Sequence, residues 1–142
     1  MSKRNLKGLV INGLLVILVF NVAILGYRLT RAPVDLVVLT LDKQAVGYDE
    51  DLTMTIHNYG FRWISFGTPY AIFREYDNGT IEKFKFPENS AWAAIEIIIG
   101  PLIGDYNQRI YTHLEPGGYF VLKEFEIDGY GKYSKAVSFT VR

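Results

Sequence analysis

The stretch that decides the fold is LEPGGYFVLKEFEIDGYGKYSKAVSFTV, residues 114–141. Within it, residues 118–127 and 135–141 are runs of strand-forming residues, and the polar, glycine-rich segment DGYGKYS separates them. Short runs with a period of two, bounded by Gly, Asp and Ser, indicate antiparallel strands joined by a loop. The stretch therefore predicts a hairpin that closes an all-β domain.

A Pro-Gly turn precedes this hairpin and separates it from an earlier strand. In immunoglobulin-like (Ig-like) sandwiches, a tyrosine just after such a corner donates a hydrogen bond to upstream backbone and ties two strands together. Tyr119 has this position. We therefore predict a structural corner formed by Leu114, Pro116, Gly117 and Tyr119. The alternative is an ordinary hairpin in which the tyrosine only packs.

Further short runs with strand-like alternation precede the corner. The predicted strands are residues 34–41, 51–57, 69–76, 80–86 and 108–114, and residues 93–100 form either a strand or a buried connection. Asp77-Asn78-Gly79, between the third and fourth of them, is one of the strongest short signals for a hairpin. Seven or eight short strands in a domain of about 110 residues predict an all-β, Ig-like antiparallel β-sandwich rather than a helical or parallel α/β fold.

The order of these motifs resembles a known family. LTLDKQAVGYDEDLTMTIHNYG (residues 39–60) gives two strands that end in an Asn-x-Gly turn, and FGTPYAIFRE (residues 66–75) leads into the Asn-Gly hairpin. With LEPGGYFVLKEFEI and SFTV, these motifs resemble the bacterial Ig-like domains of membrane-anchored and secreted proteins. The stretch SAWAAIEIIIGPLIGDYNQRI (residues 90–110) departs from that pattern, because it is longer and more apolar. The resemblance implies a fold and an extracytoplasmic location, and it brings no catalytic residues.

The N-terminal segment is apolar over residues 9–27 and is interrupted only by two asparagines and two glycines. At a rise of about 1.5 Å per residue, a helix of this length is close to the thickness of about 30 Å of the hydrocarbon layer of a bilayer. Three basic residues precede the apolar run and two follow it, a small excess that favours a cytoplasmic N-terminus. We predict a cytoplasmic N-terminus (residues 1–8), a transmembrane helix (9–29), a juxtamembrane tether (30–33) and the β-sandwich (34–142).

Two other interpretations of this segment stay open. A cleaved secretory signal is one, although its best cleavage site, with Thr30 and Ala32 as the small residues, would place Pro33 directly after the cut. Processing in the manner of type IV pilins is the other, because Lys7-Gly8 before an apolar run is similar to a prepilin cleavage site. Against it, a glycine stands where pilins carry an acidic residue.

The charge balance differs between the two parts of the chain. Five of the fifteen basic residues lie in or beside the apolar segment, which leaves ten basic against fifteen acidic residues after residue 31, a net charge of about −5. Nucleic-acid binding needs a basic face that neutralises phosphates, so we predict no nucleic-acid partner. The chain has no cysteine, which excludes disulfides, thiolate metal sites and a cysteine nucleophile.

Residues that carry chemistry are scarce. His57 and His113, the two histidines, each end a predicted strand and lack the spacing of a metal site. The run Asp49-Glu50-Asp51 lacks the spacing of a calcium loop, and we interpret it as a solvated turn. No nucleophile elbow, phosphate loop or dinucleotide fingerprint occurs. We predict a non-catalytic protein without a metal, a cofactor or a small-molecule substrate.

Recognition of another protein is the function that the sequence favours. The exposed candidates are residues 59–67, in which Arg62 beside Trp63 is a composition that protein interfaces favour, and residues 97–106, which contain the apolar run 97–103. The predicted interaction surface comprises Arg62, Trp63, Phe66, Ile97, Ile98, Ile99, Leu102 and Ile103. The alternatives are that Trp63 is the buried tryptophan of a sandwich core and that the apolar run is a buried strand.

These features together predict a membrane-tethered, extracytoplasmic Ig-like interaction module of the cell membrane. It would be a non-catalytic adhesion, scaffold or assembly subunit that contacts a membrane or cell-envelope protein. The alternative is a type IV pilin-like or filament-associated subunit that is processed after Gly8. Asn78-Gly79-Thr80 fits the acceptor pattern for N-glycosylation, which makes Asn78 a candidate modification site.

Overall fold

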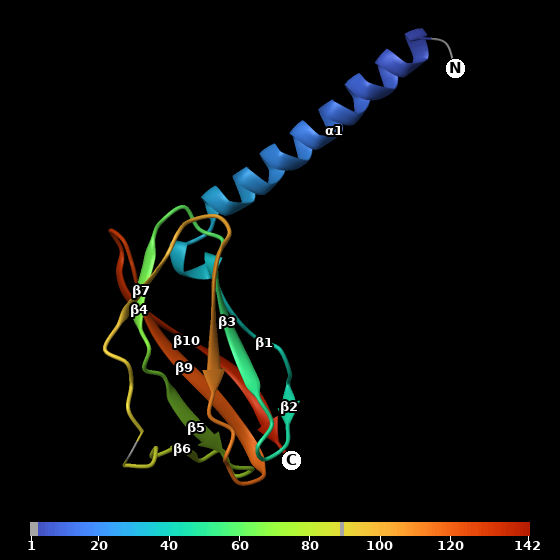
Figure 1. The fold of residues 1–142 in the computed structure, drawn as a ribbon. Coiled ribbons are helices and arrows are strands. Elements are labelled where there is room, and N and C mark those ends of the chain that lie inside the picture. Colours follow the sequence, from blue (N-terminus) through green and yellow to red (C-terminus); the bar gives the residue numbers. More distant parts are fainter. Residues whose placement is uncertain (1–2, 89) are drawn as a thin grey trace. The chain divides into compact units, whose positions relative to one another are not determined.

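The computed structural model describes residues 3–88 and 90–142. The chain divides into two compact units, an N-terminal unit up to Ala32 and a second unit from Pro33 to Arg142. The first contains helix α1 (Lys3–Thr30), and the second is built of β-strands that follow one turn of 3-10 helix, η1 (Pro33–Leu36) (Figure 1). A helix followed by a mostly β domain is the organisation that the sequence predicts.

Between residues 12 and 30, helix α1 is apolar around its circumference. Its segment Asn12–Thr30 has a mean hydropathy of 1.9 and is fully exposed, so it is long and apolar enough to cross a membrane. A signal sequence near an N-terminus has the same properties. Asn21 donates its side-chain N–H to the carbonyl oxygen of Ile17 (2.7 Å). That bond lowers the cost of placing an asparagine in apolar surroundings.

The first sheet of the β domain has three antiparallel strands. They are β1 (Val37–Leu41), β3 (Leu52–Asn58) and β8 (Gly104–Ile110), in the order β1-β3-β8. Burial alternates along β3, where Leu52, Met54 and Ile56 are fully buried and the residues between them are half-buried. This alternation turns one face of the sheet toward the core and leaves the other face to polar side chains.

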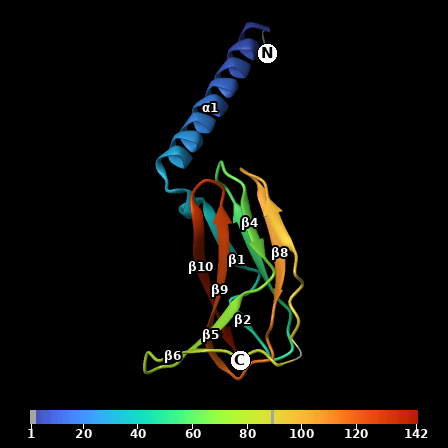
Figure 2. The same ribbon diagram turned by 90° about the vertical axis from the view of Figure 1, so that its left-hand side faces the viewer.

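The second sheet is centred on a long hairpin (Figure 2). Its strands are β2 (Ala45–Val46), β4 (Ile64–Gly67), β5 (Ala71–Glu75), β6 (Ile81–Lys83), β7 (Glu96–Ile99), β9 (Gly117–Ile127) and β10 (Gly131–Val141). β9 pairs with β10 along its whole length, and its other edge pairs with β5 and then with β4. β6 and β7 extend the sheet beyond β5 and β4, and β2 pairs in parallel with the end of β10.

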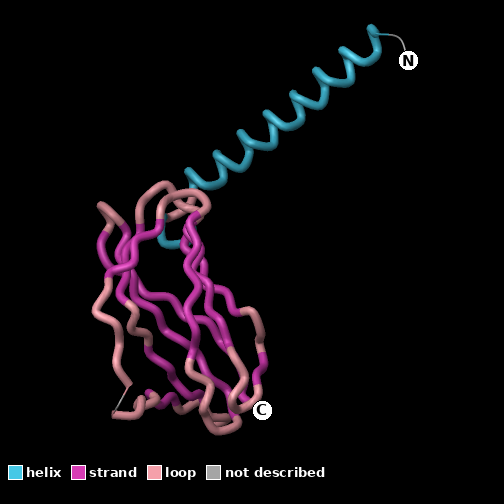
Figure 3. Tube along the Cα trace, viewed as in Figure 1, coloured by secondary structure: helices cyan, strands magenta, loops and turns pink. Residues whose placement is uncertain are grey.

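The two sheets pack face to face around one apolar core (Figure 3). The chain passes from the first sheet to the second between β1 and β2, and a long antiparallel hairpin completes the second sheet. The domain is therefore a mostly β fold of two packed sheets. Residues from both sheets fill the core, among them Val37, Met54, Ile56, Ile110, Ile72, Val121, Phe125 and Phe139. Burial of these side chains is the main favourable contribution to folding.

Both predicted hairpins are confirmed, and several predicted boundaries are wrong. β5 and β6 pair around Asp77-Asn78-Gly79, where Gly79 has the positive φ of +80° that such a turn requires. Residues 34–36 belong to η1 instead of the first strand, because Pro33 fixes its own φ and offers no N–H to a ladder. The strand predicted at residues 108–114 is β8, which ends at Ile110.

The structure contains the corner hydrogen bond that the sequence predicts. Tyr119 is buried at the start of β9, and its hydroxyl donates to the carbonyl oxygen of Glu115 (2.8 Å). Its ring stacks on Phe139 of β10, with 5.7 Å between ring centroids. Arg74 of β5 adds bonds to the Glu115 carboxylate and to the carbonyl oxygen of Pro116. The segment before β9 is thereby joined to both neighbours of that strand.

Replacing Tyr119 with phenylalanine removes this hydroxyl and leaves the Glu115 carbonyl without its partner. We expect the free energy of unfolding of the β domain to fall by about 1 kcal/mol. Denaturant unfolding in detergent micelles, followed by tryptophan fluorescence, measures it, because Trp63 and Trp92 both lie in this domain. Tyr133→Phe is the control, since that hydroxyl makes one exposed bond of 3.4 Å. Equal stability of Tyr119→Phe and the unchanged protein would contradict a structural corner.

Candidate functional site

Three loops meet at one end of the sandwich. They follow β3 (residues 59–63), β7 (residues 100–103) and β9 (residues 128–130), and both ribbon views place them at the same end (Figures 1 and 2). The N–H of Leu102 donates to the carbonyl of Gly60 (2.8 Å), and the N–H of Asp128 donates to the carbonyl of Trp63 (3.0 Å). η1 belongs to this end too, because the N–H of Tyr59 donates to the carbonyl of Leu36 (2.9 Å).

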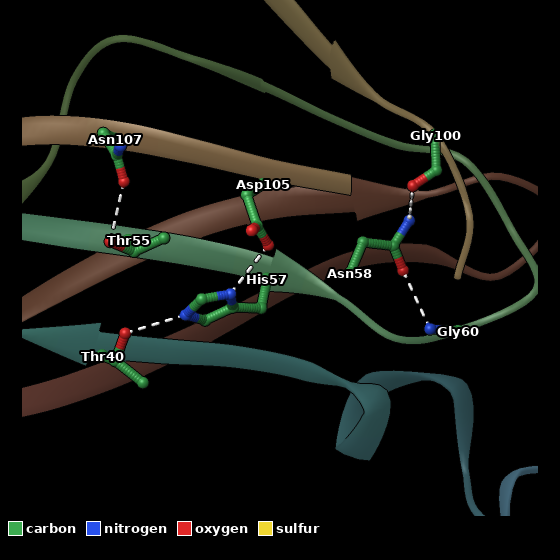
Figure 4. A network of polar contacts seen from close by, with 8 residues as sticks. All are labelled: Thr40, Thr55, His57, Asn58, Gly60, Gly100, Asp105 and Asn107. Carbon is green, nitrogen blue, oxygen red and sulfur yellow. Dashed lines mark hydrogen bonds and ion pairs between the residues drawn. The ribbon is translucent and has the colours of Figure 1, made fainter. Parts of the chain in front are cut away.

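One buried side chain fixes two of these loops to each other. Asn58, at the end of β3, donates its side-chain N–H groups to the carbonyls of Arg62 (2.8 Å) and Gly100 (2.9 Å). Its side-chain oxygen accepts a hydrogen bond from the N–H of Gly60 (3.1 Å) (Figure 4). Because Asn58 is only 1% exposed, these bonds are shielded from water. The loops therefore form a rigid surface at this end.

Large apolar side chains gather on this surface, which we call the apolar end. It consists of Tyr59, Phe61, Trp63, Ile98, Leu102, Ile103 and Tyr130. These are seven of the eleven exposed large apolar side chains in the described part of the β domain, and the other four are Tyr48, Ile81, Trp92 and Ile95. Ile103 is 84% exposed and Trp63 is 55% exposed. A concentration of this kind indicates a contact surface.

The turn between β7 and β8 holds its apolar residues outward at a cost in backbone energy. Leu102 has a φ of +78°, in the left-handed region that residues with a side chain avoid. Gly104 follows, and a β-carbon there would lie 2.4 Å from the carbonyl oxygen of Gly100, so the position has room only for glycine. The hydrogen bond from Leu102 to Gly60 secures the turn. Leu102 and Ile103 are thus presented to the surroundings by a fixed backbone.

The structure brings together five residues of the predicted interaction surface. Arg62, Trp63, Ile98, Leu102 and Ile103 are exposed at this end. The Arg62 guanidinium lies 5.7 Å from the ring centroid of Tyr130, and the Trp63 ring packs against Gly100. Trp63 is therefore not the buried tryptophan of the core.

Three predicted surface residues are corrected by the structure. Phe66 and Ile99 are each 5% exposed and belong to the core, and Ile97 is half-buried against it. β4 and β7 pair as antiparallel strands, so alternate side chains on each must face the interior. Tyr59 and Phe61 lie in the candidate stretch of residues 59–67, whereas Tyr130, which sequence analysis did not name as a surface residue, is added to the apolar end by the fold.

A hydroxyl, an imidazole and a carboxylate lie in line across the first sheet. Thr40 Oγ1 is 2.9 Å from His57 Nε2, and His57 Nδ1 is 2.7 Å from Asp105 Oδ1 (Figure 4). Hydrolytic triads have this order of groups. Here the three residues come from β1, β3 and β8, and they line neither the hollow over β4, β9 and β10 nor the hollow beside β5 and β6. We assign them to cross-strand stabilisation, with His57 also stacked on Tyr59.

The other polar residues singled out by the sequence form exposed pairs. His113 contacts Asp49, and Arg109 contacts Asp51, in ion pairs at the surface. Among the described residues, no three His, Asp or Glu side chains group as they would around a metal ion. Asn78 lies in the exposed β5–β6 turn, where its side-chain oxygen accepts a hydrogen bond from the N–H of Thr80 (2.9 Å).

Two hollows lie on the described part of the β domain, and the first adjoins the apolar end. One, of about 480 Å³, crosses β4, β9 and β10 and is lined by Glu96, Glu124, Glu126, Lys132 and Tyr133 among others. The second, of about 390 Å³, includes Arg74, Lys83, Lys85, His113 and Glu115. Both are shallow and carry charges of both signs. Neither collects groups that are oriented for one reaction.

Lys123 is a fully buried cation in the centre of the sandwich. Its Nζ donates to the carbonyls of Gly67 (2.6 Å) and Pro69 (3.0 Å) and to the side-chain oxygen of Gln108 (3.0 Å). The carbonyl of Thr68 is a fourth, longer contact (3.3 Å). Burial lowers the pKa of Lys123 from 10.5 to about 8. A shifted, buried lysine is often catalytic, but this one has no exposed surface through which to reach a substrate.

The fold has been compared with known proteins. No protein-family model matches the chain, and no curated protein matches it. Among solved structures it is similar to the ASH/PapD-like domain of human CEP192, with a TM-score of 0.43 and 10% identity over 80% of this chain and 88% of that one. It is also similar to the Northeast Structural Genomics Consortium target SoR45, with a TM-score of 0.42 and 13% identity over 74% and 83% of the two chains. Likeness at this level carries no argument about function.

The buried position of Lys123 predicts an unusual pH dependence of stability. The folded domain releases this proton near pH 8, whereas the unfolded chain keeps it until about pH 10.5, the ordinary value. Between these values the unfolded state binds more protons, so the free energy of unfolding rises with pH, by at most about 1.4 kcal/mol per pH unit. At pH 7 we expect Lys123→Met to be about 2 kcal/mol less stable, because buried carbonyls lose their donor.

Unfolding of the unchanged protein and of Lys123→Met between pH 7 and pH 9.5 tests this. The difference in stability should grow with pH, since only the unchanged protein gains stability over this range. Lys132→Met, which removes an exposed lysine on the neighbouring strand, is the control and should keep the pH dependence of the unchanged protein. A stability difference that stays constant or shrinks with pH would contradict a buried lysine.

Proposed function

We propose that this chain is a membrane-anchored, extracytoplasmic and non-catalytic Ig-like interaction module, a scaffold or assembly subunit of a membrane or cell-envelope complex. The observation that carries the proposal is the connection between its two units. Only Arg31 and Ala32 separate helix α1, which is long and apolar enough to cross a bilayer, from η1 of the β domain. Such a connection suits a domain that works at the membrane surface.

The length of the connection limits where the domain can act. Three peptide steps join Thr30 to Pro33, and at about 3.8 Å per step they extend to about 11 Å. A domain on this tether cannot reach across the distances that an adhesin spans. Its partner is therefore a protein embedded in the same membrane or close to it.

The charges and the exposed groups support binding of a protein partner rather than catalysis or nucleic-acid binding. The part of the chain after residue 31 carries ten basic against fifteen acidic residues, which disfavours a nucleic-acid partner. The Thr40–His57–Asp105 line lies outside both hollows, and Lys123 is inaccessible. An Ig-like fold in itself is compatible with many functions, so the proposal depends on these features.

The anchor is tested with arginine substitutions in α1. Val19→Arg with Val22→Arg places two charges near the middle of the apolar segment, each at a cost of about 3 kcal/mol. We expect the unchanged protein to stay in the membrane pellet after a carbonate wash and the double variant to be released. Thr30→Arg is the matched control, because an arginine at the end of a span reaches the headgroups, and it should stay in the pellet.

N-terminal sequencing of the native protein separates the alternatives. Met1 or Ser2 as first residue supports the retained anchor. Pro33 as first residue would contradict it in favour of a secreted domain, and Leu9 would favour a filament subunit. Purification in several mild detergents, with mass spectrometry of the proteins that co-elute, then tests the partner. Recovery of the chain alone in every detergent would contradict a role as a complex subunit.

A further inference from the structure

We propose that the apolar end of the sandwich is a lipid-binding face that lies in the headgroup region of the membrane in which α1 is anchored. The proposal rests on the proposed function, since it requires the anchor. It identifies what the surface formed by the three loops binds. The surface would insert into the boundary between headgroups and acyl chains, where apolar side chains are buried and polar groups remain hydrated.

The composition of the apolar end matches this environment. Tyr59, Trp63 and Tyr130 combine an apolar ring with a polar group, and tryptophan and tyrosine are the residues enriched where membrane meets water. Leu102 and Ile103 supply exposed aliphatic side chains, and Ile103 is the more exposed of the two. Arg62, exposed between them, provides a cation for lipid phosphates.

The length of the tether allows this end to lie close to the headgroups. The apolar segment Asn12–Thr30 has 19 residues. As a helix this segment is about 28 Å long, so it extends from one edge of the hydrocarbon layer to the other. Pro33 follows within about 11 Å of Thr30, a distance comparable to the headgroup layer. Since Leu36 of η1 is hydrogen-bonded to Tyr59, the loops of the apolar end are tied to the point at which the chain enters the domain.

The rigidity of the apolar end favours binding without a large ordering cost. Asn58 fixes the loops on both sides of it, and the hydrogen bond between Leu102 and Gly60 holds the strained turn that presents Ile103. Side chains that are already held outward lose little conformational entropy when lipid surrounds them. Three acidic residues lie at or beside this end, Asp35 in η1, Asp105 at the start of β8 and Asp128 on the third loop, and each is exposed, so that its carboxylate can remain in the aqueous layer.

The two tryptophans provide a direct test. Trp63 belongs to the apolar end, whereas Trp92 packs against Tyr70 and Phe86 elsewhere in the domain. Two full-length variants, Trp92→Phe and Trp63→Phe, each keep one of them. Both are reconstituted into phosphatidylcholine–phosphatidylglycerol vesicles with bromine on the acyl chains near the headgroups. We expect several-fold stronger quenching of Trp63 than of Trp92.

A surface substitution provides the second measurement. Ile103→Asp, in the variant that retains Trp63, changes a side chain that is 84% exposed, so it should leave folding intact. Because aspartate at the interface opposes insertion, the quenching of Trp63 should fall toward that of Trp92. Ile81→Asp, at an exposed position of β6, is the matched control and should leave the quenching of Trp63 unchanged.

The outcomes separate this proposal from the one on which it rests. Failure of the chain to float with the vesicles on a density gradient would contradict the anchor and, with it, the lipid-binding face. Flotation with equal, weak quenching of both tryptophans would overturn the lipid-binding face and leave the anchor standing. Cross-linking between copies through a cysteine at position 103 would overturn it in favour of a surface that binds a second copy of this chain.

Discussion

The sandwich depends on how a positive charge is accommodated in its core. Lys123 stands on the inward face of β9, at a position where the alternation of that strand calls for an apolar residue. The desolvation cost of its ammonium group is offset by hydrogen bonds to backbone carbonyls, which are free because β4 and β5 do not form one continuous strand. The carbonyls of Gly67 and Pro69 turn inward at the break and bind it, and Gln108 binds it from the opposite sheet. Through these contacts Lys123 joins the break between β4 and β5 to β8 of the opposite sheet.

A rigid sandwich gives the loops at its end a fixed base. Asn58, like Lys123, is a buried polar side chain that forms hydrogen bonds with backbone groups outside the strands, here in the loops that follow β3 and β7. The surface that results is apolar and lies where the chain enters the domain through η1. Under the proposed function, this surface would hold the β domain close to the membrane.

Much of this architecture is predictable from local sequence. The alternation in β3 and β9, the Asn-Gly turn before Thr80 and the position of Tyr119 each specify structure within a few residues. The contents of the apolar end are not predictable in this way, because they depend on which of two faces a short strand turns to the core. Ile98 and Ile99 are neighbours in an apolar run, yet one is 62% exposed and the other is 5% exposed. From the sequence alone Lys123 would likewise be predicted to be exposed, because the carbonyls that bind it become apparent only with the break between β4 and β5.

The central claim is that the β domain lies outside the cytoplasm on a single retained span. The absence of cysteine makes a direct measurement straightforward, because one cysteine in place of exposed Ser138 becomes the only thiol of the chain. A membrane-impermeant maleimide is then applied to intact cells whose outer layers admit it, and to lysed cells. The account predicts equal labelling in the two samples, with the labelled chain retained in the membrane at its full mass. Labelling that appears only after lysis, or a labelled chain that lacks the helix, would contradict it.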